Sequence, residues 1–367
     1  MRYGRCAVRL SAADICNGGA VRKIFDIHVH FPRNWEKPDA DPAPLVENLY
    51  NHAKAAGVTK ANLLCGGRFG ISHEDSIKQA QRFPDLFIPT AMVDPETTTP
   101  ERLHELRDMG YRGLKMIGVT RDYDCPDYFP VYETAQEFGW PILLHMGVIG
   151  GGIDYLRTHP RRDPAAAEGY RRWMQVWRTV RNVSAIRMRP FHLDTIANNF
   201  PDLKLIGAHL GGTGNYDEAA SVARWRHNVY FDFSGGTTIE RHAVERRLIG
   251  HEIGYEKLIF GSDTQPEKIG EHIRRWDTIF DLLDVPDDCR ERLWWYNGAE
   301  LYGEEPTAWL ESDDAAKPKR RAPVRVASGK RASANGRRNG ASPPSARKRA
   351  PAKPKPSARR TTIRRGA

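Results

Sequence analysis

Cysteine is scarce in this chain and never stands in a paired motif. The 367 residues include only five cysteines, Cys6, Cys16, Cys65, Cys125 and Cys289. An odd number of scattered cysteines argues against a disulfide scaffold and against a zinc site built from cysteines. Reduced thiols are typical of the cytoplasm, so we expect a cytoplasmic protein.

Long apolar runs are also missing. No stretch approaches the roughly 18 to 20 apolar residues that a membrane helix needs, so no membrane association is expected. Residues 1–23 carry positive charge but lack the continuous apolar stretch of a signal peptide. We expect them to form a loose N-terminal extension without a function of its own.

Acidic residues are absent from residues 315–367, which hold 18 of the 56 lysines and arginines. The preceding residues therefore carry 38 basic and 46 acidic groups, a net charge of −8. A segment rich in Lys, Arg, Pro, Ala and Ser buries too little apolar surface to offset its ordering entropy, so residues 311–367 are predicted to be a disordered tail. Such a tail attracts polyanions nonspecifically, or it serves to solubilise the protein by charge repulsion.

Short apolar runs alternate with amphipathic helical patterns between residues 24 and 310. The predicted strands are 24–31, 59–66, 86–94, 111–118, 140–147, 203–211, 229–234 and 257–263, and helical patterns between them include 44–57, 72–83, 100–109 and 129–138. Parallel strands need crossover helices, and eight such repeats predict an α/β fold, a (β/α)8 barrel of the TIM type. A doubly wound open sheet is the alternative.

The first predicted strand contains Phe25-Asp26-Ile27-His28-Val29-His30. Strict alternation would place Asp26, His28 and His30 on one face and the three apolar residues on the other. Buried polar groups need a compensating partner, and imidazole with carboxylate suits zinc, iron or manganese. Two satisfied core histidines near a salt bridge are the alternative.

Further polar residues follow later strands. His145 ends the fifth predicted strand, His209 the sixth and Asp263 the eighth. Because the carboxyl ends of barrel strands converge on one mouth, these residues are expected to meet there, although they are far apart in sequence. Asp232, inside the seventh predicted strand, is expected to satisfy a neighbouring backbone group or lysine.

Together these residues resemble the amidohydrolase superfamily, within it the amidohydrolase-related group that includes aminocarboxymuconate semialdehyde decarboxylase. The resemblance spans about residues 24–303 and rests on the first strand, on His145, on Ala208-His209-Leu210-Gly211-Gly212, on Gly261-Ser262-Asp263 and on Asn297-Gly298-Ala299-Glu300-Leu301-Tyr302-Gly303. It implies one divalent metal, zinc before manganese or iron, with ligands His28, His30, His145 and Asp263.

The resemblance also implies catalytic roles. A bound cation lowers the pKa of its water towards 7, Asp263 would accept that water's proton, and His209 would stabilise the oxyanion. Asp26 is read as a support that orients a ligand histidine. Lys115 is either carboxylated and bridges two metals, or its ammonium meets a carboxylate of the substrate or of Asp94.

An insertion, residues 148–189, follows the fifth predicted strand and is expected to act as a lid beside the mouth. From Arg157 to Arg189 it contains nine arginines against two acids, which favours an anionic substrate. Trp173 and Trp177 share a helical face and are candidate substrate contacts, as is Arg68 after the second strand. Alternatively the tryptophans pack on the barrel or in a homodimer interface, and the arginines are solvated.

Three functions remain open. The first is a metal-dependent hydrolase that uses a metal-activated water on an amide, ester or lactone of a small anionic compound, aromatic or not. The second is a metal-dependent non-oxidative decarboxylase of an aromatic or muconate-like acid. The third is a polyanion-binding protein that works through residues 315–367.

Overall fold

The computed structural model describes residues 22–33, 40–66, 71–150 and 182–304. Within them, eight parallel strands pair in the order of the sequence, so that the sheet runs from β1 to β8 and curls into a nearly closed TIM-type barrel. The strands are β1 (Phe25–His30), β2 (Lys60–Cys65), β3 (Phe87–Val93), β4 (Leu114–Met116), β5 (Ile142–Leu144), β6 (Leu205–Gly207), β7 (Val229–Asp232) and β8 (Leu258–Ile259). The predicted barrel is confirmed, with each strand lying inside its predicted range.

Two backbone hydrogen bonds link the first strand to the eighth. Ile27 N donates to Phe260 O at 3.0 Å, and Asp263 N donates to His28 O at 2.8 Å. The second of these bonds holds Asp263 directly beside the end of β1. The contact that closes the barrel therefore also places Asp263 beside His28.

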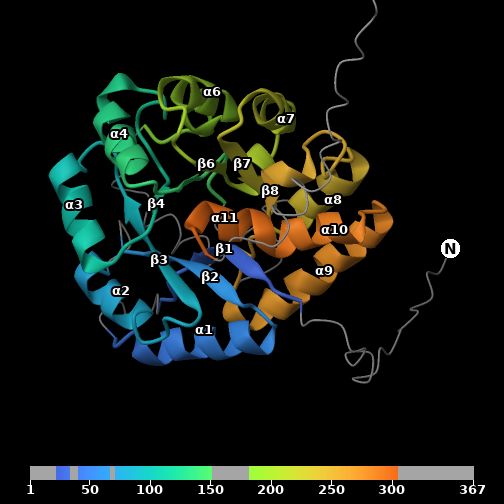
Figure 1. Ribbon diagram of the computed structural model, residues 1–367, viewed down its shortest axis with the longest axis horizontal. Helices are drawn as coiled ribbons and strands as arrows, with labels where there is room; N and C mark the ends of the chain where they lie inside the picture. Colours follow the sequence, from blue (N-terminus) through green and yellow to red (C-terminus); the bar gives the residue numbers. More distant parts are fainter. Residues whose placement is uncertain (1–21, 34–39, 67–70, 151–181, 305–367) are drawn as a thin grey trace, which may run out of the picture. The chain divides into compact units, whose positions relative to one another are not determined.

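Helices surround the sheet in sequence order (Figure 1). They are α1 (Ala43–Ala55), α2 (His73–Ala80), α3 (Pro100–Met109), α4 (Phe129–Glu137), α6 (Pro190–Asn199), α7 (Tyr216–Trp225), α8 (Thr237–Glu245) and α9 (Ile269–Leu282), followed by α10 (Asp287–Glu291) and α11 (Asn297–Tyr302). Within the described ranges, no helix combines the length and the apolar character needed to cross a membrane.

Local sequence explains where several helices begin and end. The α3 helix starts with Thr99, whose side chain accepts a hydrogen bond from Arg102 N, and it ends at Gly110 in the left-handed conformation.

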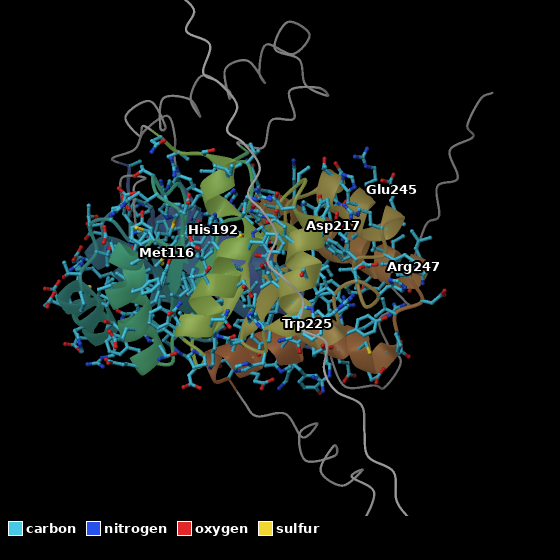
Figure 2. All side chains as sticks on the ribbon, turned by 90° about the horizontal axis from the view of Figure 1, so that it is seen from above. Met116, His192, Asp217, Trp225, Glu245 and Arg247 are labelled. Carbon is cyan, nitrogen blue, oxygen red and sulfur yellow. The ribbon has the colours of Figure 1, made fainter. Side chains whose placement is uncertain are left out.

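Figure 2 labels Asp217 and Trp225 at opposite ends of α7, with His192 of α6 level with Asp217. Because the outer helices return antiparallel to the strands, these helix starts lie on the side of the strands' carboxyl ends.

Apolar side chains form two layers. An outer layer packs strands against helices, and an interior layer fills the barrel with residues such as Phe25, Ile88 and Ile206. Helix α11 covers the amino end of this interior, since Phe25 packs against Tyr302 of α11 with ring centroids 5.5 Å apart. A Cβ at Gly298 would lie 2.2 Å from the Phe25 ring, so only glycine fits at this position.

The predicted uniform alternation along β1 is wrong. Asp26 pairs with Ala61 and Val29 with Leu63, so β1 holds one more residue than β2 in this interval. Such a β-bulge re-aims the side chains that follow it. Ile27 accordingly lies in the interior layer while Val29 lies in the outer layer. The bulge turns His28 and His30 towards the inside of the barrel, whereas uniform alternation along β1 would have turned them outwards.

Candidate active site

The site lies at the mouth of the barrel, which we define as the carboxyl ends of its strands. The structure brings together there the six polar residues predicted for its centre: His28 and His30 of β1, Lys115 of β4, His145 after β5, His209 after β6 and Asp263 after β8. Each comes from a different strand except the two histidines of β1. Catalytic groups of TIM barrels occupy this face.

Asp263 is the centre of the cluster. Its Oδ1 lies 3.4 Å from His30 Nε2 and 3.8 Å from His28 Nε2, and its Oδ2 lies 3.9 Å from His209 Nε2. Burial by itself would raise the pKa of Asp263, but the neighbouring histidines and Lys115 outweigh it and hold the pKa below its usual value. At neutral pH the mouth therefore contains an ionised carboxylate that three imidazoles face.

The backbone near this carboxylate is strained. His209, Leu210 and Asp263 adopt positive φ angles of 60°, 52° and 42°, a region that costs a non-glycine residue about 1–2 kcal/mol. Such strain persists only where the surroundings determine the conformation, and it gathers at functional sites. The two glycines after Leu210 have no room for a side chain, because a Cβ on Gly212 would lie 2.5 Å from Met146 O.

Asp232 makes the contact that sequence reasoning missed. Its Oδ2 lies 2.8 Å from His28 Nδ1, and its Oδ1 accepts from His209 N at 2.8 Å. The backbone partner agrees with the sequence-based prediction, whereas the histidine ring was not foreseen. Burial opposes ionisation, but the charge and hydrogen bond of His28 together with further donors lower the pKa of Asp232 well below its usual value.

Asp26 makes no hydrogen bond to a histidine ring among the described residues and contacts His28 through its backbone. Its Oδ1 accepts from two backbone amides, His28 N at 3.2 Å and Ser262 N at 2.8 Å. Burial raises the pKa of Asp26 to about 6. Its position before the bulge explains the difference, because the ring of His28 turns towards β7 and meets Asp232 instead.

Lys115 is completely buried and is the middle residue of β4, between Leu114 and Met116 of the outer apolar layer. Its Nζ lies 3.3 Å from His28 Nε2. Burial lowers its pKa to about 8, while the charges of Asp232 and Asp263 oppose that shift. The lysine is therefore mostly protonated at neutral pH and places one positive charge under the carboxylates of the mouth.

His145 and His209 face each other. His209 Nε2 lies 3.3 Å from His145 Nδ1, and His145 Nε2 lies 3.3 Å from Val148 O. Burial lowers the pKa of His209 to about 4 and that of His145 well below its usual value. Both rings are neutral at physiological pH, the form in which imidazole binds a metal.

The donor set fits a divalent cation. Nitrogen and oxygen atoms of His28, His30 and Asp263 all lie within 4.8 Å of one another. The separations of 3.8 Å and 3.4 Å between Asp263 Oδ1 and the two Nε2 atoms exceed normal hydrogen-bond lengths. Imidazole together with carboxylate is a ligand combination that suits zinc, manganese or iron. His145 reaches this group through its contact with His209.

Three predicted substrate contacts, Arg68, Trp173 and Trp177, lie outside the described residues. Arg33, which sequence reasoning missed, is half-buried three residues after His30. Burial lowers the pKa of His30 against the opposing charge of Asp263, and the charge of Arg33 is among those that lower it further. An arginine shortly after the two histidines of the first strand was the available sequence signal.

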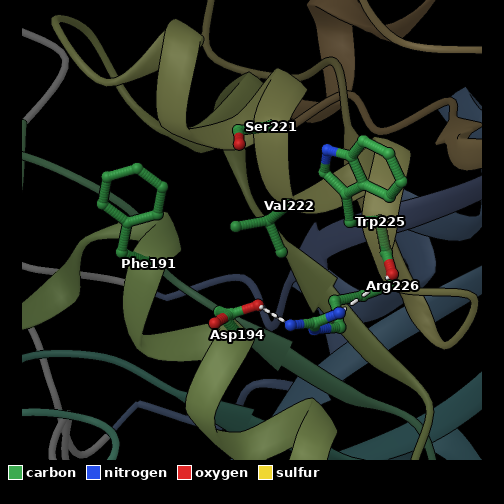
Figure 3. Close-up of a pocket in the computed structure, with 6 residues that line it drawn as sticks. All are labelled: Phe191, Asp194, Ser221, Val222, Trp225 and Arg226. Atoms are coloured by element: carbon green, nitrogen blue, oxygen red, sulfur yellow. Dashed lines mark hydrogen bonds and ion pairs between the residues drawn. The ribbon is translucent and has the colours of Figure 1, made fainter. Parts of the chain in front are cut away.

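A depression lies on the outer wall between α6 and α7, with a volume of about 330 Å³ (Figure 3). Phe191, Val222 and Trp225 contribute its apolar lining, and Asp194 pairs with Arg226 across it at 2.7 Å. None of the residues predicted for the mouth lines this depression. It is therefore separate from the candidate active site.

A parallel barrel with histidines and a carboxylate at its mouth defines the class of TIM-type barrel enzymes. The model of the Amidohydrolase family matches residues 25–303, which include every strand and the closing helix. The chain belongs to the amidohydrolase family.

Relatives of known name include both decarboxylases and hydrolases. The chain is 22% identical over 283 residues to gamma-resorcylate decarboxylase of Polaromonas sp. (strain JS666 / ATCC BAA-500), covering 67% of this chain and 78% of the relative. Its fold is similar to a probable 2-pyrone-4,6-dicarboxylic acid hydrolase from Acinetobacter baumannii (TM-score 0.52, 17% identity, 76% of this chain and 99% of that chain). It is also similar to 5-carboxyvanillate decarboxylase from Sphingomonas paucimobilis (TM-score 0.50, 13% identity, 78% and 100%).

Proposed function

We propose that the chain is a metal-dependent hydrolase that opens an amide, ester or lactone of a small anionic ring compound. The observation that carries this proposal is the convergence of three histidines on the carboxylate of Asp263. Asp263 is an ionised carboxylate and His209 is neutral, so the resting site is prepared to accept protons. Hydrolysis begins with removal of a proton from water, which this pattern serves.

The proposed metal site consists of His28, His30, His145 and Asp263. A divalent metal held there would supply water of lowered pKa and would polarise the scissile carbonyl. Asp263 then accepts the proton of the attacking water and transfers it to the leaving group. The neutral ring of His209 faces this carboxylate, with its Nε2 3.9 Å from Asp263 Oδ2.

Positive groups near the mouth support an anionic substrate. Lys115 contributes a buried charge beneath the histidines, and Arg33 contributes a second charge near His30. A guanidinium pairs with a carboxylate in a bidentate geometry. The hydrolase from Acinetobacter baumannii, whose name specifies a dicarboxylic acid, was crystallised with citric acid bound.

A metal-dependent non-oxidative decarboxylase is the second candidate. The named sequence relative is a decarboxylase, and its similarity covers two thirds of this chain. In that reaction a proton replaces carbon dioxide on the substrate, so the site must donate a proton to carbon. Lys115, with a pKa of about 8, is a group of the described mouth that can donate a proton near neutral pH.

The two reactions are separated by their products. Full-length protein loaded with zinc or manganese is incubated with aromatic acids and with carboxylated lactones, amides and esters. Ring or acyl opening without release of carbon dioxide supports the hydrolase, and release of carbon dioxide supports the decarboxylase. If metal is bound and every compound stays intact, both proposals are wrong.

A variant tests the role of Asp263. Asp263→Asn removes the proton acceptor and is expected to lower kcat at least a hundredfold, the usual loss for a general base. Asp108→Asn on the surface of α3 removes one carboxylate from a side chain that is 78% exposed and serves as the control. Equal activity of Asp263→Asn and Asp108→Asn contradicts the proposed mechanism.

A further inference from the structure

Ser234 connects the carboxylate of Asp232 to His209, and no sequence motif had assigned it a role. Its Oγ lies 2.6 Å from Asp232 Oδ1, 2.8 Å from His209 Nδ1 and 3.2 Å from His28 Nδ1. Ser234 and Asp232 are both fully buried. The hydroxyl therefore stands between one carboxylate and two histidines of the mouth, out of contact with solvent.

The direction of each hydrogen bond follows from Asp232. Its Oδ1 accepts from the backbone amides of His209 at 2.8 Å and Ser234 at 3.0 Å, which are obligatory donors. An ionised carboxylate only accepts. The single hydroxyl proton of Ser234 is thus directed to Asp232 Oδ1, at the shortest of the three Oγ distances.

That direction determines the proton positions on two rings. Since the one hydroxyl hydrogen of Ser234 is donated to Asp232 Oδ1, Ser234 Oγ can only accept from His209, so His209 Nδ1 carries a hydrogen. A neutral imidazole has one N–H, which leaves a lone pair on His209 Nε2. His28 is held in the same tautomer, because its Nδ1 donates to Asp232 Oδ2 at 2.8 Å.

We propose that Ser234 is a positioning residue that fixes His209 as the Nδ1–H tautomer and so presents the Nε2 lone pair to the mouth. The inference deepens the proposed function, on which its catalytic consequence rests. Asp232 fixes the direction of the Ser234 hydroxyl, and this hydroxyl in turn fixes the hydrogen position on His209. The same oxygen of Asp232 also anchors the backbone of His209, whose φ of 60° is strained.

Packing beside Ser234 is tight. A Cβ on Gly235 would lie 3.1 Å from His209 Nδ1 and 2.9 Å from Ile239 Cγ1, so the residue after Ser234 has no space for a side chain. Without the hydroxyl, His209 Nδ1 loses its acceptor. The ring is then free to carry its hydrogen on Nε2, where it faces His145 Nδ1 at 3.3 Å.

Long-range proton–nitrogen correlation of the imidazole rings tests the tautomer directly. Full-length protein is labelled with ¹⁵N-histidine and loaded with zinc, and the His209 signals are identified by their absence in His209→Asn. We expect a protonated Nδ1 and a bare Nε2 in the unaltered protein. A protonated Nε2, or protons on both nitrogens, overturns the proposal without any variant of Ser234.

Ser234→Ala is expected to move the His209 hydrogen to Nε2, in whole or in part, and to lower kcat ten- to hundredfold with little change in KM. Ser234→Thr keeps the hydroxyl and should retain the original tautomer. Ser262→Ala is the matched control, because Ser262 is an equally buried serine shortly after the next strand and makes no hydrogen bond to His209. An unchanged His209 spectrum in Ser234→Ala refutes the relay.

The ring spectrum and the substrate assay fail independently. The tautomer is read without substrate, so a correct His209 spectrum with no turnover on any compound leaves the relay standing and refutes only the proposed function. A wrong spectrum in a protein that hydrolyses its substrate does the reverse.

Discussion

His272 offers a test of the folded structure that does not involve the mouth. It lies on the buried face of α9, and its side chain is only 7% exposed. Its Nε2 lies 3.0 Å from Arg275 Nη2, and its Nδ1 has no hydrogen-bond partner. Burial, followed by the charge of Arg275, lowers the pKa of His272 to about 4. The perturbation is His272→Gln, which keeps a polar side chain that can accept from Arg275.

The magnitude follows from the difference between folded and unfolded pKa values. A histidine whose folded pKa is depressed contributes stability above its unfolded pKa of about 6.5, and this stability is lost as the pH falls towards 4. The full difference of about 2.5 units corresponds to about 3 kcal/mol in the free energy of unfolding. About 2 kcal/mol of this should be lost between pH 7 and pH 5.

The assay is urea unfolding at several pH values from 7 to 5, for the unaltered protein and for His272→Gln. The stability of the unaltered protein is expected to fall relative to that of the variant as the pH decreases. His251→Gln, at a surface histidine that is 68% exposed, is the control for loss of one imidazole. A constant difference between the unaltered protein and His272→Gln across this range refutes the reasoning.

Three further predictions concern the metal, the strained turn and the tail. Purified or zinc-reconstituted protein should hold about one equivalent of metal, and His28→Ala with His30→Ala should lose it; below half an equivalent, measured by elemental analysis, the metal site is wrong. Gly212→Ala should lower the free energy of unfolding by more than about 2 kcal/mol, because its Cβ would lie 2.5 Å from a carbonyl oxygen. Gly57→Ala, at the same φ of 83° but with open space around it, should cost about 1 kcal/mol, and equal losses in urea contradict the clash. Deletion of residues 315–367 should abolish salt-sensitive DNA binding in a filter assay and leave turnover intact, and DNA binding that survives the deletion refutes the role of the tail.

The repeating pattern of the sequence was sufficient to predict the barrel. Each of the eight strands lies within its predicted range, and α3 has the predicted bounds, Pro100 to Met109. The predicted strands were too long, most of all at β8, which spans only Leu258–Ile259. Apolar character continues past the last ladder hydrogen bond because the residues at strand ends are also buried, so composition alone does not mark where pairing stops.

The site was predictable where strand ends carry isolated histidines. Their convergence follows from the parallel topology, and that topology can be predicted from local patterns of strands and helices in the sequence. Asp232 was predicted only to satisfy a backbone group or a lysine, and Ser234 was not identified, although a carboxylate and a hydroxyl two positions apart at the end of a barrel strand resemble the histidine pair of β1. Their role depends on which rings they touch, and ring contacts between β7, β1 and β6 are set by packing.

The sequence by itself determined the parallel barrel, the order of its strands and the set of groups at its mouth, because hydrophobic periodicity and strand-end position are local properties. Only the tertiary structure decided which carboxylate serves which histidine. A single extra residue in β1 rotated His28 away from the side chain of Asp26 and towards Asp232. A bulge depends on pairing with the neighbouring strand, and no pattern within one strand records it.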